Sequence, residues 1–192
     1  SRPIAEPITL MDCAPIGDGA AAVVLCPLEK AKKFTKNEPI IIAGVGESTE
    51  PLPLNQREDL LSFKSIINAS QKAYKMAKIT PKEIQIAEIF DPYTITGIIA
   101  LEDLGFAKKG KATELLKEGF FSKNGEKPIN ISGGLKARGH PIGATGVYQI
   151  AEIAMALRGE EPLKLEKQPE IGLAQATSGL GALTTISILK RS

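Results

Sequence analysis

Residues 130–146 read NISGGLKARGHPIGATG, and this stretch carries the strongest signal in the chain. It predicts a short strand over residues 128–132, a glycine-rich loop, and then a helix over residues 144–157. Backbone amides at such a helix start favour anionic groups, and glycines let a ligand approach the main chain. The loop also holds His140, the only histidine of the chain. Taken alone, a histidine in such a turn is more often structural than functional.

The composition is that of a globular protein. With 192 residues, 43% of them hydrophobic and 24% charged, the chain can bury a core, and its length predicts one domain over residues 1–192. Its 24 basic and 22 acidic residues give a net charge of +2, and the basic residues are scattered. Nucleic-acid binding is therefore not expected. The chain has no apolar stretch of the roughly 20 residues that a membrane-spanning helix needs, and no targeting segment, so we expect a cytoplasmic protein without a membrane partner.

Short β-branched runs alternate with longer amphipathic runs, which is typical of an α/β fold. We expect a mixed five-stranded sheet covered by helices. The predicted strands cover residues 20–25, 40–45, 86–89, 128–132, 171–176 and 183–189, and the last two form a hairpin. The predicted helices cover residues 60–76, 94–104, 113–118 and 144–157. The chain begins at Ser1 in an extended, proline-containing segment, which suggests a fragment, a processed product or a trimmed chain.

The stretch 130–146 resembles the signature of the thiolase family, in which Gly-Gly-Leu-Lys-Ala, Gly-His-Pro and Gly-Ala-Thr-Gly follow one another, especially in its archaeal and sterol-carrier-type branch. Two other segments agree with this resemblance. Residues 7–22 look like the segment that opens the C-terminal half of the family, and residues 179–182 (GLGA) lie where the family ends on its final hairpin. The resemblance spans essentially all of this chain and about half of a whole thiolase, so it implies one of the two similar halves of the thiolase fold.

The resemblance implies a role for His140. In thiolases a cysteine of the N-terminal half attacks a coenzyme A thioester, and the Gly-His-Pro histidine draws off the thiol proton, since a thiolate is the competent nucleophile. His140 matches that histidine, and the same ring would donate to a thioester oxygen. Ser132, Gly133 and Gly134 would lie along the bound thioester. The resemblance implies no cofactor other than the coenzyme A thioester as substrate, and no metal.

Neither cysteine of the chain can be the nucleophile by position. Cys13 lies in the opening extended segment and Cys26 at the end of an apolar run, so we interpret both as structural. The nucleophile would come from an N-terminal half or a partner subunit, and the chain alone should be inactive.

Two positions depart from the family pattern. Where the family carries Asn-Glu-Ala-Phe, or a version with His-Asp, this chain has Phe90-Asp91-Pro92-Tyr93, and phenylalanine can neither order a water nor donate a hydrogen bond. Where the family places a cysteine or a His-Asn pair as second acid/base, this chain has Gln175-Ala176. A carboxamide orients but does not shuttle protons near neutral pH, so carbon–carbon bond formation through an enolate is not supported.

Three functional hypotheses remain open. The first is an acyl-coenzyme A module of the acetyl-coenzyme A acetyltransferase or 3-ketoacyl-coenzyme A thiolase type in lipid metabolism, which supplies His140. The second is a non-catalytic subunit that binds acyl-coenzyme A or scaffolds a partner. The third is a thiolase-like aldolase that uses Tyr93 as a proton or hydrogen-bond donor; the competing interpretation is that Asp91 caps the following helix and Tyr93 packs. The resemblance also implies a homo-oligomer, at least a dimer.

The sequence makes one geometric prediction. The segments that hold His140, Gln175 and residues 90–93 all follow or end strands, where ligand sites of α/β folds gather. His140 should therefore lie at the mouth of a groove, within roughly 10 Å of Gln175 or of the turn at residues 90–93.

Overall fold

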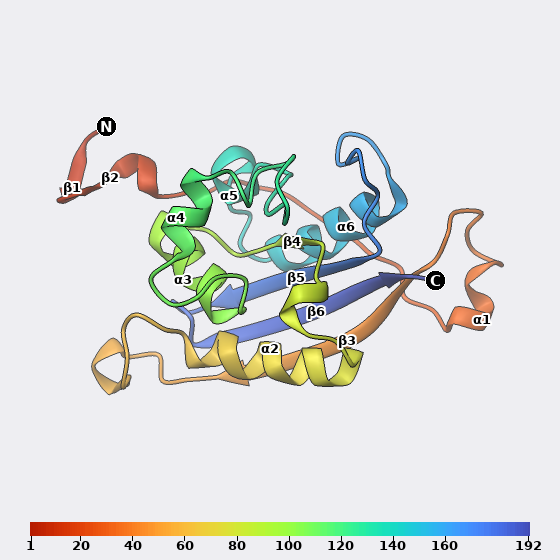
Figure 1. Cartoon of the computed structure of the whole chain (residues 1–192), viewed down its shortest axis with the longest axis horizontal. Helices are drawn as coiled ribbons and strands as arrows, with labels where there is room; N and C mark the ends of the chain where they lie inside the picture. The colour runs from red at the N-terminus through yellow and green to blue at the C-terminus, as the bar shows by residue number, and fades with distance from the viewer.

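The computed structural model describes all 192 residues and is built around a four-stranded mixed sheet (Figure 1). The strand order is β3 (Ile40–Thr49), β6 (Leu183–Arg191), β5 (Ile171–Ser178) and β4 (Ile86–Glu88). β6 pairs antiparallel with both β3 and β5, whereas β4 runs parallel to β5. The predicted α/β class is confirmed. Because β4 and β5 are parallel, the residues that follow β4 lie beside the later residues of β5, and the candidate site forms there.

Helices cover both faces of the sheet, as Figure 1 shows for α2 (Lys64–Ala77) and α6 (Thr145–Arg158). Strand residues alternate between the two faces, so neighbours in sequence enter different cores. Ala87, Leu173 and Ile188 pack with α2 and α3 (Thr94–Asp103). Their neighbours Ile86, Ala174 and Leu189 pack with α6.

Several short elements complete the chain. The N-terminal arm holds β1 (Pro3–Ala5), β2 (Ile8–Thr9), the 3-10 turn Leu10–Asp12 and α1 (Leu28–Ala31). Further along lie the 3-10 turns Leu54–Gln56 and Pro81–Glu83, α4 (Ala112–Lys117) and α5 (Gly134–Arg138). α5 lies inside the stretch that the sequence predicted to be a plain loop. No helix of the chain is both long enough and apolar enough to cross a bilayer.

The sheet has four strands and not the expected five. Residues 128–132, predicted as a strand, contribute only one parallel bridge, between Ile129 and Ala87 at the edge next to β4. Asn130 adopts a left-handed backbone conformation with φ 50°, which ends the extended path after a single pair. The segment thus reaches the position of a fifth strand but turns away to become the loop before α5.

Residues 20–25 form no strand, contrary to the prediction. This apolar segment is extended, but no backbone hydrogen bond joins it to another part of the chain. Val24 and Leu25 are 86% and 71% exposed. Residues 20–25 have the composition of a buried strand, but this chain provides no strand to pair with them.

Candidate functional site

His140 is held at the end of the glycine-rich loop by its own backbone. Gly139 has φ 82°, a conformation that favours glycine, and it turns the chain toward the N-terminal arm. The His140 amide then donates to the carbonyl of Pro15 at 2.8 Å, and His140 forms a parallel bridge with Ile16. The arm therefore fixes the histidine backbone from a segment more than a hundred residues away in sequence.

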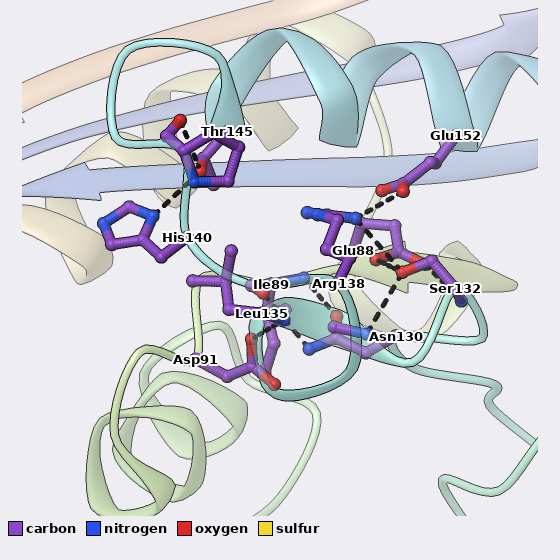
Figure 2. A network of polar contacts seen from close by, with 12 residues as sticks. Glu88, Ile89, Asp91, Asn130, Ser132, Leu135, Arg138, His140, Thr145 and Glu152 are labelled. Atoms are coloured by element: carbon purple, nitrogen blue, oxygen red, sulfur yellow. Dashed lines mark hydrogen bonds and ion pairs between the residues drawn. The ribbon is translucent and has the colours of Figure 1, made fainter. Parts of the chain in front are cut away.

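One side-chain contact fixes the imidazole ring. Nδ1 of His140 lies 2.9 Å from Oγ1 of Thr145, the first residue of α6 (Figure 2). The Thr145 hydroxyl donates to the Pro141 carbonyl at 3.2 Å, so its lone pair is left to accept from Nδ1–H. In the neutral ring this assignment leaves the lone pair on Nε2, the nitrogen that can take a proton from a substrate or nucleophile.

The surroundings of His140 favour its neutral form. Phe90, two residues after β4, meets the imidazole edge to face, with ring centroids 5.2 Å apart and an interplanar angle of 75°. Burial, followed by the nearby positive charge of Arg138, lowers the pKa of His140 below its usual value. At neutral pH the ring is therefore a base with a free Nε2.

Gln175 lies at the same site, and both ends of its carboxamide are engaged. It is fully buried in β5; its Oε1 accepts from the Phe90 amide at 2.8 Å, and its Nε2 donates to Oγ1 of Thr177 at 2.5 Å. The side chain thus extends the β4–β5 pairing and fixes the backbone of Phe90. The predicted proximity is confirmed, since Phe90 contacts the His140 ring and is bonded to Gln175.

These residues line a cavity of about 350 Å³. Its walls are largely apolar and come from the arm, α2, the turn after β4, the His140 loop and the β5–β6 hairpin. They comprise Ala14, Ile16, Phe63, Ile66, Phe90, Pro92, Tyr93, Thr96, His140, Ile142, Gln175, Thr177, Ser178, Gly179, Leu180 and Gly181. Tyr93 is 41% exposed. The rim is apolar as well, because Ile16, Ile142 and Leu180 are exposed.

Asp91 does not cap α3, contrary to one interpretation of the sequence. Its Oδ1 accepts from the Leu135 amide at 3.0 Å, so Asp91 holds the start of α5, while Thr96 bonds to the backbone of Tyr93 at the start of α3. Burial raises the pKa of the Asp91 carboxyl above its usual value. A side chain at Gly134 would place its Cβ 2.5 Å from Asp91 Oδ2.

Ser132, Gly133 and Gly134 lie away from the cavity. Ser132 bonds to Glu88, and the space beside Gly134 is filled by the Asp91 side chain. A ligand-binding role for these three residues stays a prediction.

The sequence did not single out a polar cluster behind the loop (Figure 2). Glu88, the last residue of β4, is 1% exposed and faces Ser132, Arg138 at the end of α5, and Glu152 on α6. The available signal was a single carboxylate in the otherwise apolar run Ile86–Ile89. A charged residue in a buried strand needs a polar partner.

A scan against protein families matches residues 46–191 to the thiolase C-terminal domain-like family. The acetyl-CoA acetyltransferases of Methanothermobacter thermautotrophicus and Methanocaldococcus jannaschii are each 41% identical, over 100% and 98% of this chain. The sterol carrier protein 2 of Oryctolagus cuniculus is 31% identical over 99% of it. The chain spans 50% of the two archaeal relatives and 35% of the rabbit relative.

Among solved structures, a chain described as "Ltp2-ChsH2(DUF35) aldolase" superposes with a TM-score of 0.82 at 24% identity, covering 100% of this chain and 49% of that one. At this identity the match shows a common fold.

Proposed function

The chain belongs to the thiolase family, as a member of its C-terminal domain type, and on that premise we propose that it is the half of an acyl-coenzyme A enzyme that supplies the base. The observation that carries the proposal is the state of His140. Its Nδ1 is committed to Thr145, and its ring faces an apolar cavity in the neutral form. Such a ring takes a proton at Nε2 and returns it from the same atom.

The proposed acyl transfer uses Nε2 of His140 as the proton carrier. A cysteine thiol from a second half gives its proton to Nε2 of His140, and the thiolate attacks the carbonyl carbon of an acyl thioester. The carbon–sulfur bond to the enzyme forms, the bond to coenzyme A breaks, and the leaving coenzyme A thiolate takes the proton back from Nε2. This exchange needs one base.

Carbon–carbon chemistry needs more than this chain offers at the matching positions. An enolate must receive or lose a proton at carbon, and Phe90 carries no proton donor. Gln175 has both ends of its carboxamide engaged by Phe90 and Thr177. Acyl transfer is therefore the reaction that the residues of this chain support best.

The second half is expected to pack on the face that holds the cavity and the N-terminal arm. The chain spans about half of its archaeal relatives, and apolar side chains are exposed around the cavity and along the arm. Residues 20–25 lack a pairing partner in this chain, and a strand of the other half would provide one. Mixing the two halves should give a stable complex on gel filtration.

The test joins this chain to a half that carries a nucleophile. The N-terminal half of the Methanothermobacter relative is fused upstream of Ser1, and exchange of labelled coenzyme A into acetyl-coenzyme A is measured. We expect exchange by the fusion, none by the chain alone, and a loss of at least about 100-fold with His140→Ala. Exchange that survives this substitution contradicts the proposal. Binding of acetyl-coenzyme A without exchange would favour the non-catalytic subunit instead.

Tyr93 favours one second candidate, an aldolase-type cleavage of a hydroxyacyl thioester. Tyr93 lines the same cavity as His140. A solved structure of similar fold is described as an aldolase. Tyr93→Phe separates the two functions, because it should abolish aldol cleavage and leave thioester exchange unchanged.

A further inference from the structure

The loop that carries His140 is attached to the end of β4 at successive positions (Figure 2). Asn130 Oδ1 accepts from the Ile89 amide at 2.7 Å, and its Nδ2 donates to the Ile89 carbonyl at 3.2 Å. Asp91 accepts from the Leu135 amide at 3.0 Å. Between Asn130 and Leu135 along the loop, Ser132 is attached to Glu88, which is fully buried, unlike Asn130 and Asp91.

Glu88 holds Ser132 with both carboxylate oxygens. Oε1 accepts from the Ser132 amide at 3.2 Å, and Oε2 accepts from the Ser132 hydroxyl at 2.8 Å. The same hydroxyl oxygen accepts from the Gly134 amide at 3.2 Å and from Nη1 of Arg138 at 3.3 Å. The Ser132 hydroxyl therefore links the first and last residues of α5, and His140 follows two residues later.

This arrangement requires an acceptor at Oε2. The Ser132 oxygen already receives two donors, so its own proton must go to Glu88. If Glu88 is protonated at Oε2, its proton competes with that of Ser132 and one bond of the cluster is lost. With Glu88 ionised, the Ser132 amide, the Ser132 hydroxyl and the Gly134 amide all keep their partners.

We propose that Glu88 is a positioning residue for His140: as a carboxylate it fixes Ser132, and through Ser132 it fixes α5 and the ring that follows. The placement of the ring does not depend on the reaction, whereas the consequence for activity rests on the function proposed above.

The charges of the cluster explain why the attachment depends on protonation. Two carboxylates, Glu88 and Glu152, face one guanidinium, and Arg138 pairs with Glu152. Tyr148 stacks on Arg138, with the guanidinium carbon 5.3 Å from the ring centroid. Oε2 of Glu152 and Nε of Arg138 have no partner. Burial, and next the charge of Glu152, raise the pKa of Glu88 to about 7, so the attachment forms as pH rises through neutrality.

The single histidine of the chain gives a direct test, because its ring protons are one set of signals in an NMR titration. In the wild-type protein we expect the His140 signal to show its own titration and a second inflection near the Glu88 pKa of about 7. Glu88→Gln mimics the protonated acid. The variant should show no second inflection. At pH 8 its His140 signal should be displaced from the wild-type signal, in the direction in which protonation of Glu88 shifts the wild-type signal.

Two further variants sharpen the test. Glu152→Gln leaves both bonds of Glu88 to Ser132 in place and removes the like charge, so the second inflection should move to lower pH. Glu114→Gln on the exposed face of α4 should change nothing. If Glu88→Gln does not fold, the Glu152 variant still decides. A wild-type signal with one inflection, or a second inflection that Glu152→Gln does not move, overturns the proposal.

The part of the test that depends on the proposed function uses the fused enzyme. Glu88→Gln should lower kcat by about 10- to 100-fold at pH 8 with little change in KM, because the ring is misplaced and the cavity is intact. An inactive fusion combined with the expected NMR result leaves the positioning role standing and removes the proposed function.

Discussion

The ring of Phe90 meets the imidazole of His140 edge to face at 5.2 Å, and the backbone amide of the same residue is held by Gln175 at 2.8 Å. One residue therefore joins the two positions at which this chain departs from the family pattern. Its side chain packs against the imidazole, while its backbone amide binds the Gln175 carboxamide.

Phe90→Ala should raise the pKa of His140. Burial is the largest cause of the lowered pKa, and removal of the phenyl ring admits water to one face of the imidazole. The measurement is an NMR pH titration of the His140 ring protons, with Tyr93→Phe as the control that keeps the aromatic wall. A pKa that stays the same or falls would show that Phe90 does not shield the ring.

Thr145→Val should free the imidazole without changing the shape of the cavity wall. Valine has nearly the size of threonine but cannot accept from Nδ1–H, so both tautomers become populated. Nitrogen chemical shifts of the ring report the tautomer directly. In the fused enzyme we expect thioester exchange to fall by about 10- to 100-fold, and Thr145→Ser should restore it. Equal exchange rates for the valine variant and the wild type would contradict the role of Thr145.

Stability should depend on pH through Glu88. A carboxyl whose folded pKa is raised binds its proton more tightly in the native state, so the free energy of unfolding falls as pH rises from the ordinary glutamate pKa of 4.5 to about 7. The difference of roughly 2.5 pKa units corresponds to about 3 kcal/mol. Urea unfolding at pH 5 and pH 8 should show this decrease in the free energy of unfolding of the wild type. In Glu88→Gln the decrease between the two pH values should be smaller by about the same amount. A pH dependence that is identical in both proteins would rule out a raised pKa for Glu88.

Arg57→Met should destabilise the hairpin side of the cavity. Arg57 and Glu50 are paired at 3.6 Å with side chains only 2% and 5% exposed, and Nη1 of Arg57 donates to the Leu180 carbonyl at 2.8 Å. Removal of one charge leaves Glu50 buried and unpaired, which costs about 3 to 5 kcal/mol in the free energy of unfolding. Denaturation curves measure the loss, and the double variant with Glu50→Gln should recover part of it. A cost below about 1 kcal/mol would mean that the pair behaves like a surface ion pair.

Much of the fold was predictable because its signals are local. Apolar spacing indicated α2, α3 and α6 to within a few residues, and the last two strands and their turn followed from β-branched runs separated by glycines. The family could be recognised from the stretch 130–146, since a dense motif does not depend on contacts elsewhere. The proximity of His140, Gln175 and Phe90 was predicted because their segments follow or end predicted strands.

Only the tertiary structure decided the hydrogen-bond and ion-pair partners of residues 20–25, Asp91 and Glu88. Residues 20–25 have strand composition, yet a strand exists only where another strand supplies hydrogen bonds, and this chain supplies none. Asp91 precedes α3 in sequence but bonds to Leu135, and Glu88 meets Arg138 and Glu152 only because β4, α5 and α6 converge. The sequence thus determined the family, the helices α2, α3 and α6, and the proximity of His140 to Phe90 and Gln175, while the role of His140 as a base stays a prediction. The protonation state of His140 depends first on its burial by residues such as Phe90, and that of Glu88 depends on burial and on charges brought together over 40 residues or more, which no local pattern encodes.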